Sequence, residues 1–341
     1  MQKFFSMKNV RIGINGAGRI GRLIIRMLAN HPHIEMVCIN DLMDIETLKY
    51  LIMYDSVHQK FDGTIEIQNN SIILNNMTVH YEQHDKPADI PWKKYKTDIV
   101  IDASGNFCHI SSLSGHIQAG AKKVILSCPS KDPEVKTIIM GINEGIINEH
   151  DHIVSNASCT ANGVAPMLSV MDKTFGIETA FMTTVHPFTN NQRIMDAPHP
   201  DPRRSRSLAN NIIPTHSTAV EAILQVFPKL RNKFEGVAIR VPIPAGALLE
   251  LMIKTEKPVS VSCINEAFLD ASLGSLKPFL KYTDEELVSS DIINDPSSCV
   301  FDSKMTKVIN DHYCYIAGWY DNEFGYASRV VNLAEKLSEF V

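Results

Sequence analysis

The sequence predicts an α/β protein, with a Rossmann doubly wound parallel sheet followed by an α+β domain that has a mixed or antiparallel sheet. Three observations predict it. An apolar strand pattern runs into a glycine-rich turn at residues 16–21, strand and helix patterns alternate up to about residue 158, and longer strand patterns follow. The 341 residues suffice for about two domains, which we place at 1–158 and 159–321.

The first strand, turn and helix form a dinucleotide fingerprint. Val10–Asn15 has the pattern of a buried strand, and an apolar helix pattern begins after the segment Gly16-Ala17-Gly18-Arg19-Ile20-Gly21. Gly16 allows the turn, Gly18 lets the backbone approach a pyrophosphate, and Gly21 lets the helix pack on the strand. The helix N-terminus favours anionic phosphates, so we include Arg19 and Ile20 among the cofactor-binding residues.

An acidic residue follows the second strand. The strand pattern at 36–39 ends at Asn40-Asp41, and Asp41 lies 20 residues after Gly21. Its carboxylate would accept hydrogen bonds from the adenosine ribose hydroxyls, and its charge would repel a 2′-phosphate. The cofactor predicted is therefore NAD rather than NADP. The alternative is a glycine-rich strand–helix turn in which Asp41 is only a capping residue.

Two further strands continue the parallel sheet, at 98–102 and 123–127. Small polar residues, Ser104 and Ser127, come at or just after their carboxyl ends, which is where such sheets bind ligands. Both serines are therefore candidates for cofactor binding. Residues 61–83 have the pattern of an antiparallel excursion from the sheet.

The second domain begins with a helix predicted from about Cys159, and strands follow at 178–185, 236–241 and 248–253. Residues 188–211 are polar and contain three prolines and four arginines. Because this composition is unlike that of a flexible linker, we interpret the segment as a functional or interface loop.

Cys159 and His186 are the candidate catalytic pair. A nearby imidazole can help a thiol to become a thiolate, and a helix N-terminus stabilises the thiolate further. A thiol downstream of a dinucleotide site suggests attack on an aldehyde, hydride transfer, and an acyl-thioester. Taken alone, each residue has a simpler interpretation. Cys159 could be an inert buried cysteine, and His186 could be a structural histidine whose hydrogen bonds are satisfied.

Arginines and hydroxyls indicate anion binding in the second domain. Arg240 lies near a strand end and could hold a phosphate with a bidentate contact, and Thr189, Ser217 and Thr218 could donate hydrogen bonds. For Arg240 alone, a surface salt bridge is the simpler interpretation. The cluster that contains Arg203 could equally be a solvated loop or a subunit contact.

Composition excludes several classes of protein. The net charge of −5 gives no basic field for nucleic acid, and no run of about 18 apolar residues predicts a membrane span. Seven scattered cysteines without a CxxC pair predict neither a disulfide framework nor a metal site, and reduced thiols predict a cytoplasmic protein. The first six residues are too short and too weakly apolar for a secretory signal.

Several longer motifs resemble the glyceraldehyde-3-phosphate dehydrogenase family along nearly the whole chain. They are Gly13–Arg22, Tyr54–His58, Gly120–Ile125, Ser155–Thr160, Thr189–Arg193, Arg240–Pro242 and Trp319–Tyr326. The resemblance implies a Rossmann NAD domain, a mixed-sheet catalytic domain, and a C-terminal helix at 322–341 that returns to the NAD domain. It also implies a homotetramer, in which the loop 188–211 reaches toward the neighbouring subunit's cofactor.

The resemblance also implies residue roles. Cys159 would be the nucleophile, His186 its ion-pair partner and base, and Asn322 the residue that orients the nicotinamide carboxamide. Two groups of residues would bind phosphate. The pocket for the C3 phosphate of glyceraldehyde 3-phosphate would be formed by Thr189, Asn191 and Arg240. The attacking inorganic phosphate would be bound by Ser158, Thr160, Ser217 and Thr218, with Arg203 nearby, and the product would be 1,3-bisphosphoglycerate.

Three short segments depart from the family pattern, at 161–163, 217–218 and 245–247. The family usually has Thr-Gly where Ser217-Thr218 stand, and a side chain in place of glycine could narrow the inorganic-phosphate site. This departure keeps open a non-phosphorylating erythrose-4-phosphate dehydrogenase as an alternative. An alternative of another class is a binding or moonlighting protein that retains the fold.

Overall fold

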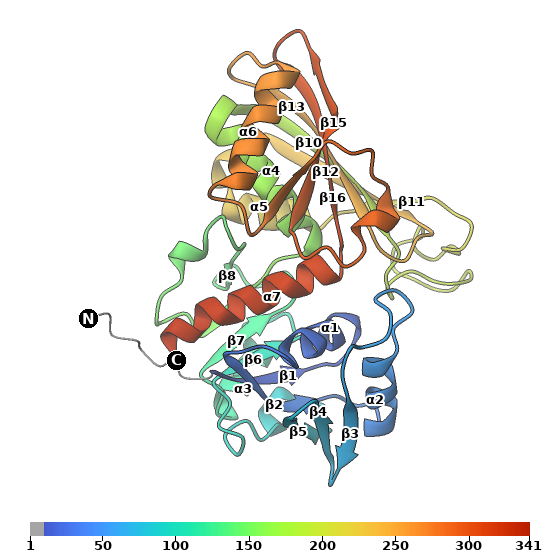
Figure 1. Cartoon of the computed structure of the whole chain (residues 1–341), viewed down its shortest axis with the longest axis vertical. Helices are drawn as coiled ribbons and strands as arrows, with labels where there is room; N and C mark the ends of the chain where they lie inside the picture. Colours follow the sequence, from blue (N-terminus) through green and yellow to red (C-terminus); the bar gives the residue numbers. More distant parts are fainter. Residues whose placement is uncertain (1–9) are drawn as a thin grey trace. The chain divides into compact units, whose positions relative to one another are not determined.

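The computed structural model describes residues 10–341, so the expectation about a secretory signal lies outside the described residues. The chain forms two compact units, which we call the first and second units. The first unit extends to Ile138 and also contains Glu144–Asn156 and Ala327–Val341, and the second comprises Ile139–Asn143 and Ala157–Tyr326. Each unit is built on its own sheet (Figure 1).

The sheet of the first unit has nine strands in the order β3-β4-β5-β2-β1-β6-β7-β9-β8. Strands β2, β1, β6, β7 and β9 are parallel neighbours, which confirms the predicted doubly wound sheet. Strands β3, β4 and β5 pair antiparallel in succession, as expected for residues 61–83. The strands are β1 Val10–Asn15, β2 Ile34–Asn40, β3 Ile65–Gln68, β4 Ser71–Leu74, β5 Met77–Glu82, β6 Ile99–Asp102, β7 Lys123–Leu126, β8 Lys136–Thr137 and β9 Ile153–Ser155.

The glycine-rich turn sets the geometry of the first unit. Gly16 has a φ of +92°, and a Cβ atom on it would lie 2.4 Å from the backbone nitrogen of Ser104, so a side chain cannot be accommodated there. Helix α1 follows and contacts β1 and β2. The helices of this part of the chain are α1 Arg19–Leu28, α2 Ile45–Met53 and α3 Ile110–Gln118, with short 3-10 turns at Pro87–Asp89 and Glu144–Ile146.

The sheet of the second unit has seven strands in the order β11-β12-β10-β13-β16-β15-β14. It is mixed, as predicted, because β10 and β12 are parallel whereas β10, β13 and β16 are antiparallel in succession. The predicted strands at 178–185, 236–241 and 248–253 all lie within observed strands. The strands are β10 Ile177–Pro187, β11 Ile213–His216, β12 Phe234–Val241, β13 Ala247–Thr255, β14 Leu280–Thr283, β15 Cys299–Ile309 and β16 Tyr313–Tyr320.

Three helices, α4 Cys159–Phe175, α5 Ala219–Val226 and α6 Val261–Leu273, lie on the same side of this sheet (Figure 1). Short 3-10 turns occur at Pro228–Leu230 and Ser289–Ile292. The core between the helices and the sheet is apolar, and α4 is buried along most of its length. Because α4 is held so firmly, its first residue has a well-defined position.

Two segments outside the sheets concern function. Residues 188–212 connect β10 to β11 and contain one isolated bridge, between Arg193 and Ser207. The last helix, α7, is Phe324–Leu337 and therefore begins two residues later than predicted; a 3-10 turn, Ser338–Phe340, follows it. Among residues 10–341, no helix has the length and apolar character needed to cross a bilayer.

Candidate active site

Cys159 is the first residue of α4, where the sequence predicted the helix to begin. Ser158 caps the helix, because its Oγ accepts a hydrogen bond from the backbone N–H of Ala161 at 3.1 Å. Ala157 has a φ of +57°, a left-handed conformation that is uncommon for a residue with a side chain. The hydroxyl of Tyr326 donates to the carbonyl of Ala157 at 3.0 Å. This turn directs the chain into the helix and places the thiol at the helix N-terminus.

The thiol and the imidazole of the predicted catalytic pair are in contact. The Sγ atom of Cys159 lies 3.4 Å from Nε2 of His186, which is near the end of β10. On the other side of the ring, Nδ1 lies 2.8 Å from the carbonyl oxygen of Pro187. A carbonyl can only accept a hydrogen bond, which favours a proton on Nδ1, whereas the guanidinium of Arg240, which also contacts Nδ1, can only donate. In the tautomer with the proton on Nδ1, the lone pair of Nε2 faces the thiol, as a base requires.

Arg240 completes this group. It lies directly opposite His186 in the parallel pairing of β10 and β12. Its Nη1 donates to the carbonyl of Pro187 at 3.0 Å and also contacts Nδ1 of His186. Its Nε is buried and has no hydrogen-bond partner among the described residues. A guanidinium with an unused donor next to a thiol is suited to receive an anionic group of a substrate.

The surroundings favour the neutral forms of the pair. Burial, reinforced by the Arg240 guanidinium, lowers the pKa of His186 to about 3. Burial raises the pKa of the Cys159 thiol, and Arg240 opposes this rise. Burial thus favours a neutral imidazole beside a thiol, and the ion pair that the resemblance implied stays a prediction.

A buried hydroxyl network lies behind the pair. The hydroxyl of Tyr320 is 2.9 Å from Oγ1 of Thr160 and 3.0 Å from Oγ1 of Thr184. The rings of Tyr320 and His186 are 6.0 Å apart in an edge-on arrangement. Sequence reasoning gave Tyr320 no role, although it quoted the residue within a family motif. Thr160 was predicted to bind phosphate, but its hydroxyl is held in this network.

Most other predicted phosphate-binding residues are held by neighbours of their own. The side chain of Thr189 donates to Gln192 at 3.0 Å, and Oδ1 of Asn191 is 3.0 Å from Nε2 of His199. Ser217 Oγ accepts from the backbone of Ala219 at 3.3 Å, and Arg203 and Thr218 are exposed. In the described chain, contacts join Cys159, His186 and Arg240 into one group. Among residues 10–341, no hydrogen bond links these five predicted phosphate-binding residues to that group.

Asn322 lies two residues before α7 in the second unit and is buried. Its Oδ1 atom has no hydrogen-bond partner among residues 10–341. A buried acceptor without a partner is costly, so Asn322 is suited to receive a donor such as a carboxamide. The adjacent Asp321 instead accepts from the backbone of Glu323 and Phe324 and begins the helix.

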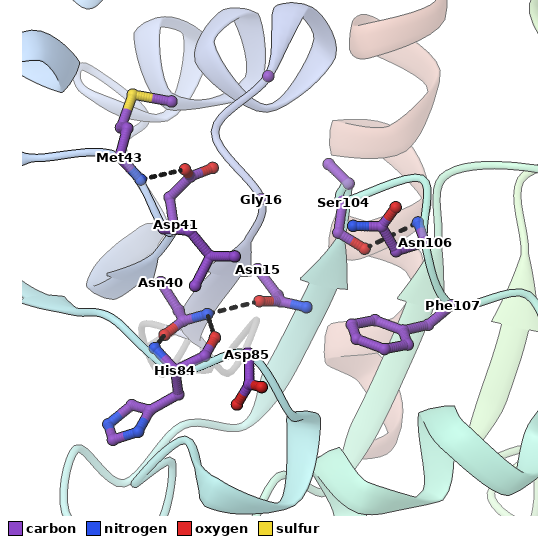
Figure 2. Close-up of a pocket in the computed structure, with 13 residues that line it drawn as sticks. Asn15, Gly16, Asn40, Asp41, Met43, His84, Asp85, Ser104, Asn106 and Phe107 are labelled. Carbon is purple, nitrogen blue, oxygen red and sulfur yellow. Dashed lines mark hydrogen bonds between the residues drawn. The ribbon is translucent and has the colours of Figure 1, made fainter.

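The first unit contains a cavity of about 210 Å³ at the carboxyl ends of its parallel strands. Four of the predicted cofactor-binding residues line it, namely Gly16, Gly18, Asp41 and Ser104. Figure 2 shows Asp41 and Met43 on one side and Ser104, Asn106 and Phe107 on the other. Arg19, Ile20 and Ser127 are not among the lining residues, and the guanidinium of Arg19 is paired with Asp55.

The cavity fits a dinucleotide. The carboxylate of Asp41 accepts hydrogen bonds from the backbone N–H groups of Ala17 at 2.6 Å and Met43 at 3.0 Å. The first of these bonds holds the carboxylate beside the glycine-rich turn. A Cβ atom on Gly18 would meet open space, which leaves the backbone there accessible to a pyrophosphate. Sequence reasoning missed Asn15, Asn40, His84 and Phe107, although their positions near strand ends could have indicated them. Among residues 10–341, no group of three His, Cys, Asp or Glu side chains could hold a metal.

Comparison with known proteins shows the family to which the chain belongs. Residues 10–110 match the NAD binding domain of glyceraldehyde 3-phosphate dehydrogenase, and residues 158–322 match its C-terminal domain. The chain is 44% identical to glyceraldehyde-3-phosphate dehydrogenase 2 of Streptomyces avermitilis, over 95% of this chain and 97% of the relative. It is 41% identical to glyceraldehyde-3-phosphate dehydrogenase 1 of Bacillus subtilis, over 97% of this chain and 98% of the relative. It is 43% identical to glyceraldehyde-3-phosphate dehydrogenase of Mycobacterium leprae, over 95% of this chain and 97% of the relative. The chain therefore belongs to the glyceraldehyde-3-phosphate dehydrogenase family, and its first unit carries the family's NAD-binding domain.

Proposed function

We propose that this enzyme oxidises and phosphorylates glyceraldehyde 3-phosphate to 1,3-bisphosphoglycerate, with NAD and inorganic phosphate, in glycolysis or gluconeogenesis. The observation that carries the proposal is the 3.4 Å contact between Cys159 Sγ and His186 Nε2 in a chain of this family. NAD, when bound, supplies the hydride acceptor. Gly16, Gly18, Asp41 and Ser104 would hold it, and Asn322 would accept a hydrogen bond from its carboxamide.

His186 begins the reaction by accepting the thiol proton at Nε2 as Sγ attacks the aldehyde carbon. The carbonyl of Pro187 stabilises the imidazolium that forms, because it accepts a hydrogen bond from Nδ1. The backbone N–H of Cys159 would donate to the oxyanion of the thiohemiacetal. The helix dipole of α4 favours negative charge at the same position.

The imidazolium returns its proton to the oxyanion, so that the thiohemiacetal carries a hydroxyl and Nε2 is free again. His186 then removes this hydroxyl proton while the carbonyl re-forms and the hydride leaves the same carbon for the acceptor that NAD would supply. An acyl-thioester on Cys159 remains. Inorganic phosphate attacks the thioester carbon and displaces the thiolate. Arg240, with Thr189 and Asn191, would bind the C3 phosphate of the substrate. Ser158, Thr160, Arg203, Ser217 and Thr218 would surround the inorganic phosphate. The hydrogen bonds of Ser158 and Thr160 in the present arrangement would have to be shared with that anion or exchanged for it.

The protein is proposed to act as a cytoplasmic homotetramer. All seven of its cysteines are free thiols, which is typical of a reducing compartment. In the segment 188–212, the side chains of Ile194, Met195 and Ile212 are between 70% and 74% exposed. Apolar side chains so exposed on one loop favour a contact with another subunit. Sedimentation of the purified protein would test this part of the proposal.

The decisive assay is NADH formation from glyceraldehyde 3-phosphate with and without inorganic phosphate, alongside erythrose 4-phosphate. Rapid turnover of the triose that depends on phosphate is expected. Turnover without phosphate, or a preference for the tetrose, would favour erythrose-4-phosphate dehydrogenase. The exposed side chain of Thr218, in place of the family's usual glycine, is the feature that favours this second candidate.

A further inference from the structure

Two cysteines outside the catalytic pair are in contact in the first unit. The Sγ atoms of Cys108 and Cys128 are 3.4 Å apart, and both side chains are partly exposed. Cys108 precedes helix α3, and Cys128 follows strand β7 by two residues. Neither residue has a role in the proposed reaction.

Hydrogen bonds hold the segments that carry the two cysteines next to each other. The carbonyl of Cys108 accepts from the backbone N–H of Lys131 at 3.0 Å, and the carbonyl of Cys128 accepts from the hydroxyl of Ser155 at 2.6 Å. Asp132 adds a contact at 3.1 Å to the ring of His109. The two segments are therefore held together before any bond forms between the sulfur atoms, which favours an intramolecular disulfide over reaction with other molecules.

The pair adjoins the dinucleotide cavity. Phe107, which directly precedes Cys108, lines the cavity together with Asn106 and Ser104 (Figure 2). Asn106 is tied to Ser104 by a hydrogen bond of 3.2 Å from its backbone N–H to the serine hydroxyl. A displacement of Cys108 would therefore be transmitted to one wall of the cavity.

We propose that Cys108 and Cys128 form a redox-active dithiol, which a low-molecular-weight disulfide such as glutathione disulfide converts to an intramolecular disulfide that weakens NAD binding. The effect on NAD rests on the proposed function of the cavity. A disulfide bond is about 2.05 Å long, so the sulfur atoms must approach by roughly 1.4 Å. This movement displaces the wall formed by residues 104–107.

The reaction proceeds by two exchanges. The thiolate of Cys108 attacks the reagent, breaks its S–S bond and releases one reagent thiol, which leaves a mixed disulfide. Cys128 then attacks the Cys108 sulfur and releases the second reagent thiol. Two electrons and two protons pass from the protein to the reagent. Burial and the neighbouring Cys108 raise the pKa of Cys128, so we assign the first attack to Cys108.

The first test is chemical. The full chain with Cys159→Ser, which removes the catalytic thiol, is treated with glutathione disulfide, alkylated and digested with trypsin. Cleavage at Lys96, Lys122, Lys123 and Lys131 places the two cysteines on separate peptides. A cross-linked pair of peptides is expected. A further substitution, Cys108→Ser or Cys128→Ser, should abolish the cross-link, whereas Cys263→Ser, the control, should leave it. Absence of the cross-linked pair overturns the proposal.

The second test is the dissociation constant for NAD before and after oxidation, and again after reduction with dithiothreitol. Oxidation is expected to raise it by about threefold or more, reversibly, and only when both cysteines are present. A cross-link with an unchanged dissociation constant would overturn the effect on NAD. Failure of the reduced protein to bind NAD would contradict both that effect and the proposed function, whereas the cross-linked peptides test the dithiol independently.

Discussion

Arg240 and His186 lie opposite each other on the parallel strands β12 and β10, and Nη1 of the arginine contacts Nδ1 of the histidine. A fixed positive charge next to an imidazole opposes its protonation. The same charge favours ionisation of the thiol on the other side of the ring. Arg240 thus acts on both members of the catalytic pair, in addition to any contact with substrate.

Alkylation of Cys159 by iodoacetamide should still accelerate as the pH rises through 9.0, the ordinary pKa of the thiol, because burial raises that pKa. Arg240→Gln should move the profile to higher pH, since it removes the charge that favours the thiolate. Arg231→Gln, which removes an exposed arginine, should leave it unchanged. Mass spectrometry of the Cys159 peptide gives the rate. A plateau from about pH 6 upward would indicate a preformed ion pair instead.

Stability should fall as the pH decreases from 6.5 toward about 3, because the folded state holds His186 neutral in this range. The unfolded chain takes up a proton on this residue near pH 6.5, whereas the folded chain does so only near pH 3. His186 then contributes a loss of up to about 1.4 kcal/mol per pH unit to the free energy of unfolding. Urea denaturation at several pH values should show a shallower loss for His186→Gln, and equal slopes would contradict the predicted neutral imidazole.

Tyr320→Phe should lower the free energy of unfolding by about 1–3 kcal/mol, because it leaves the buried hydroxyls of Thr160 and Thr184 without their shared partner. Tyr315→Phe is the matched control on the same strand. The hydroxyl of Tyr315 donates to Glu250 at 2.6 Å, but this side chain is less buried than that of Tyr320, so water can replace the hydroxyl. Denaturant unfolding measures both changes, and equal losses would mean that the network around Tyr320 adds no stability of its own.

Asp41→Asn should increase the preference for NADP relative to NAD by about tenfold or more, because it removes the charge that repels a 2′-phosphate. Asparagine retains an acceptor for one of the two backbone hydrogen bonds to this side chain. The ratio of kcat/KM for the two cofactors is the measurement. Asp62→Asn, at an exposed position, is the control for a change in net charge. An unchanged ratio would place cofactor selection elsewhere in the chain.

Cys159→Ser should lower kcat by about a thousandfold or more while NAD binding persists, because a serine hydroxyl is far less nucleophilic and the cavity of the first unit does not include this residue. Cys263→Ser makes the same substitution at a partly exposed cysteine that is hydrogen-bonded to Ser260. It should retain full activity. Retained turnover in Cys159→Ser would exclude the covalent mechanism.

Local signals account for the parts of the structure that the sequence predicted. The positive φ at position 16 requires a glycine, and helix α4 begins at Cys159, directly after the serine that caps the helix. The contacts that no local signal predicted join distant residues. Thr160 and Tyr320 are 160 residues apart, and Arg240 reaches His186 across 54 residues because of the register of two strands.

The same limit applies to Cys108 and Cys128. Their contact depends on the parallel pairing of β6 and β7, which brings the segments after the two strands together. The sequence contains both cysteines, but their spacing of 20 residues has no meaning until the strands are paired. Burial and its effect on the pKa of His186 likewise follow only from the assembled core.

The first unit takes its final segment, Ala327–Val341, from the end of the sequence. Val330, Leu333, Ala334 and Leu337 in this segment are fully buried. During synthesis on the ribosome, the segments of the second unit are complete by Tyr326, whereas the nucleotide-binding unit must wait for the last residues of α7. The first unit is therefore completed only after residues 157–326 of the second unit have been synthesised.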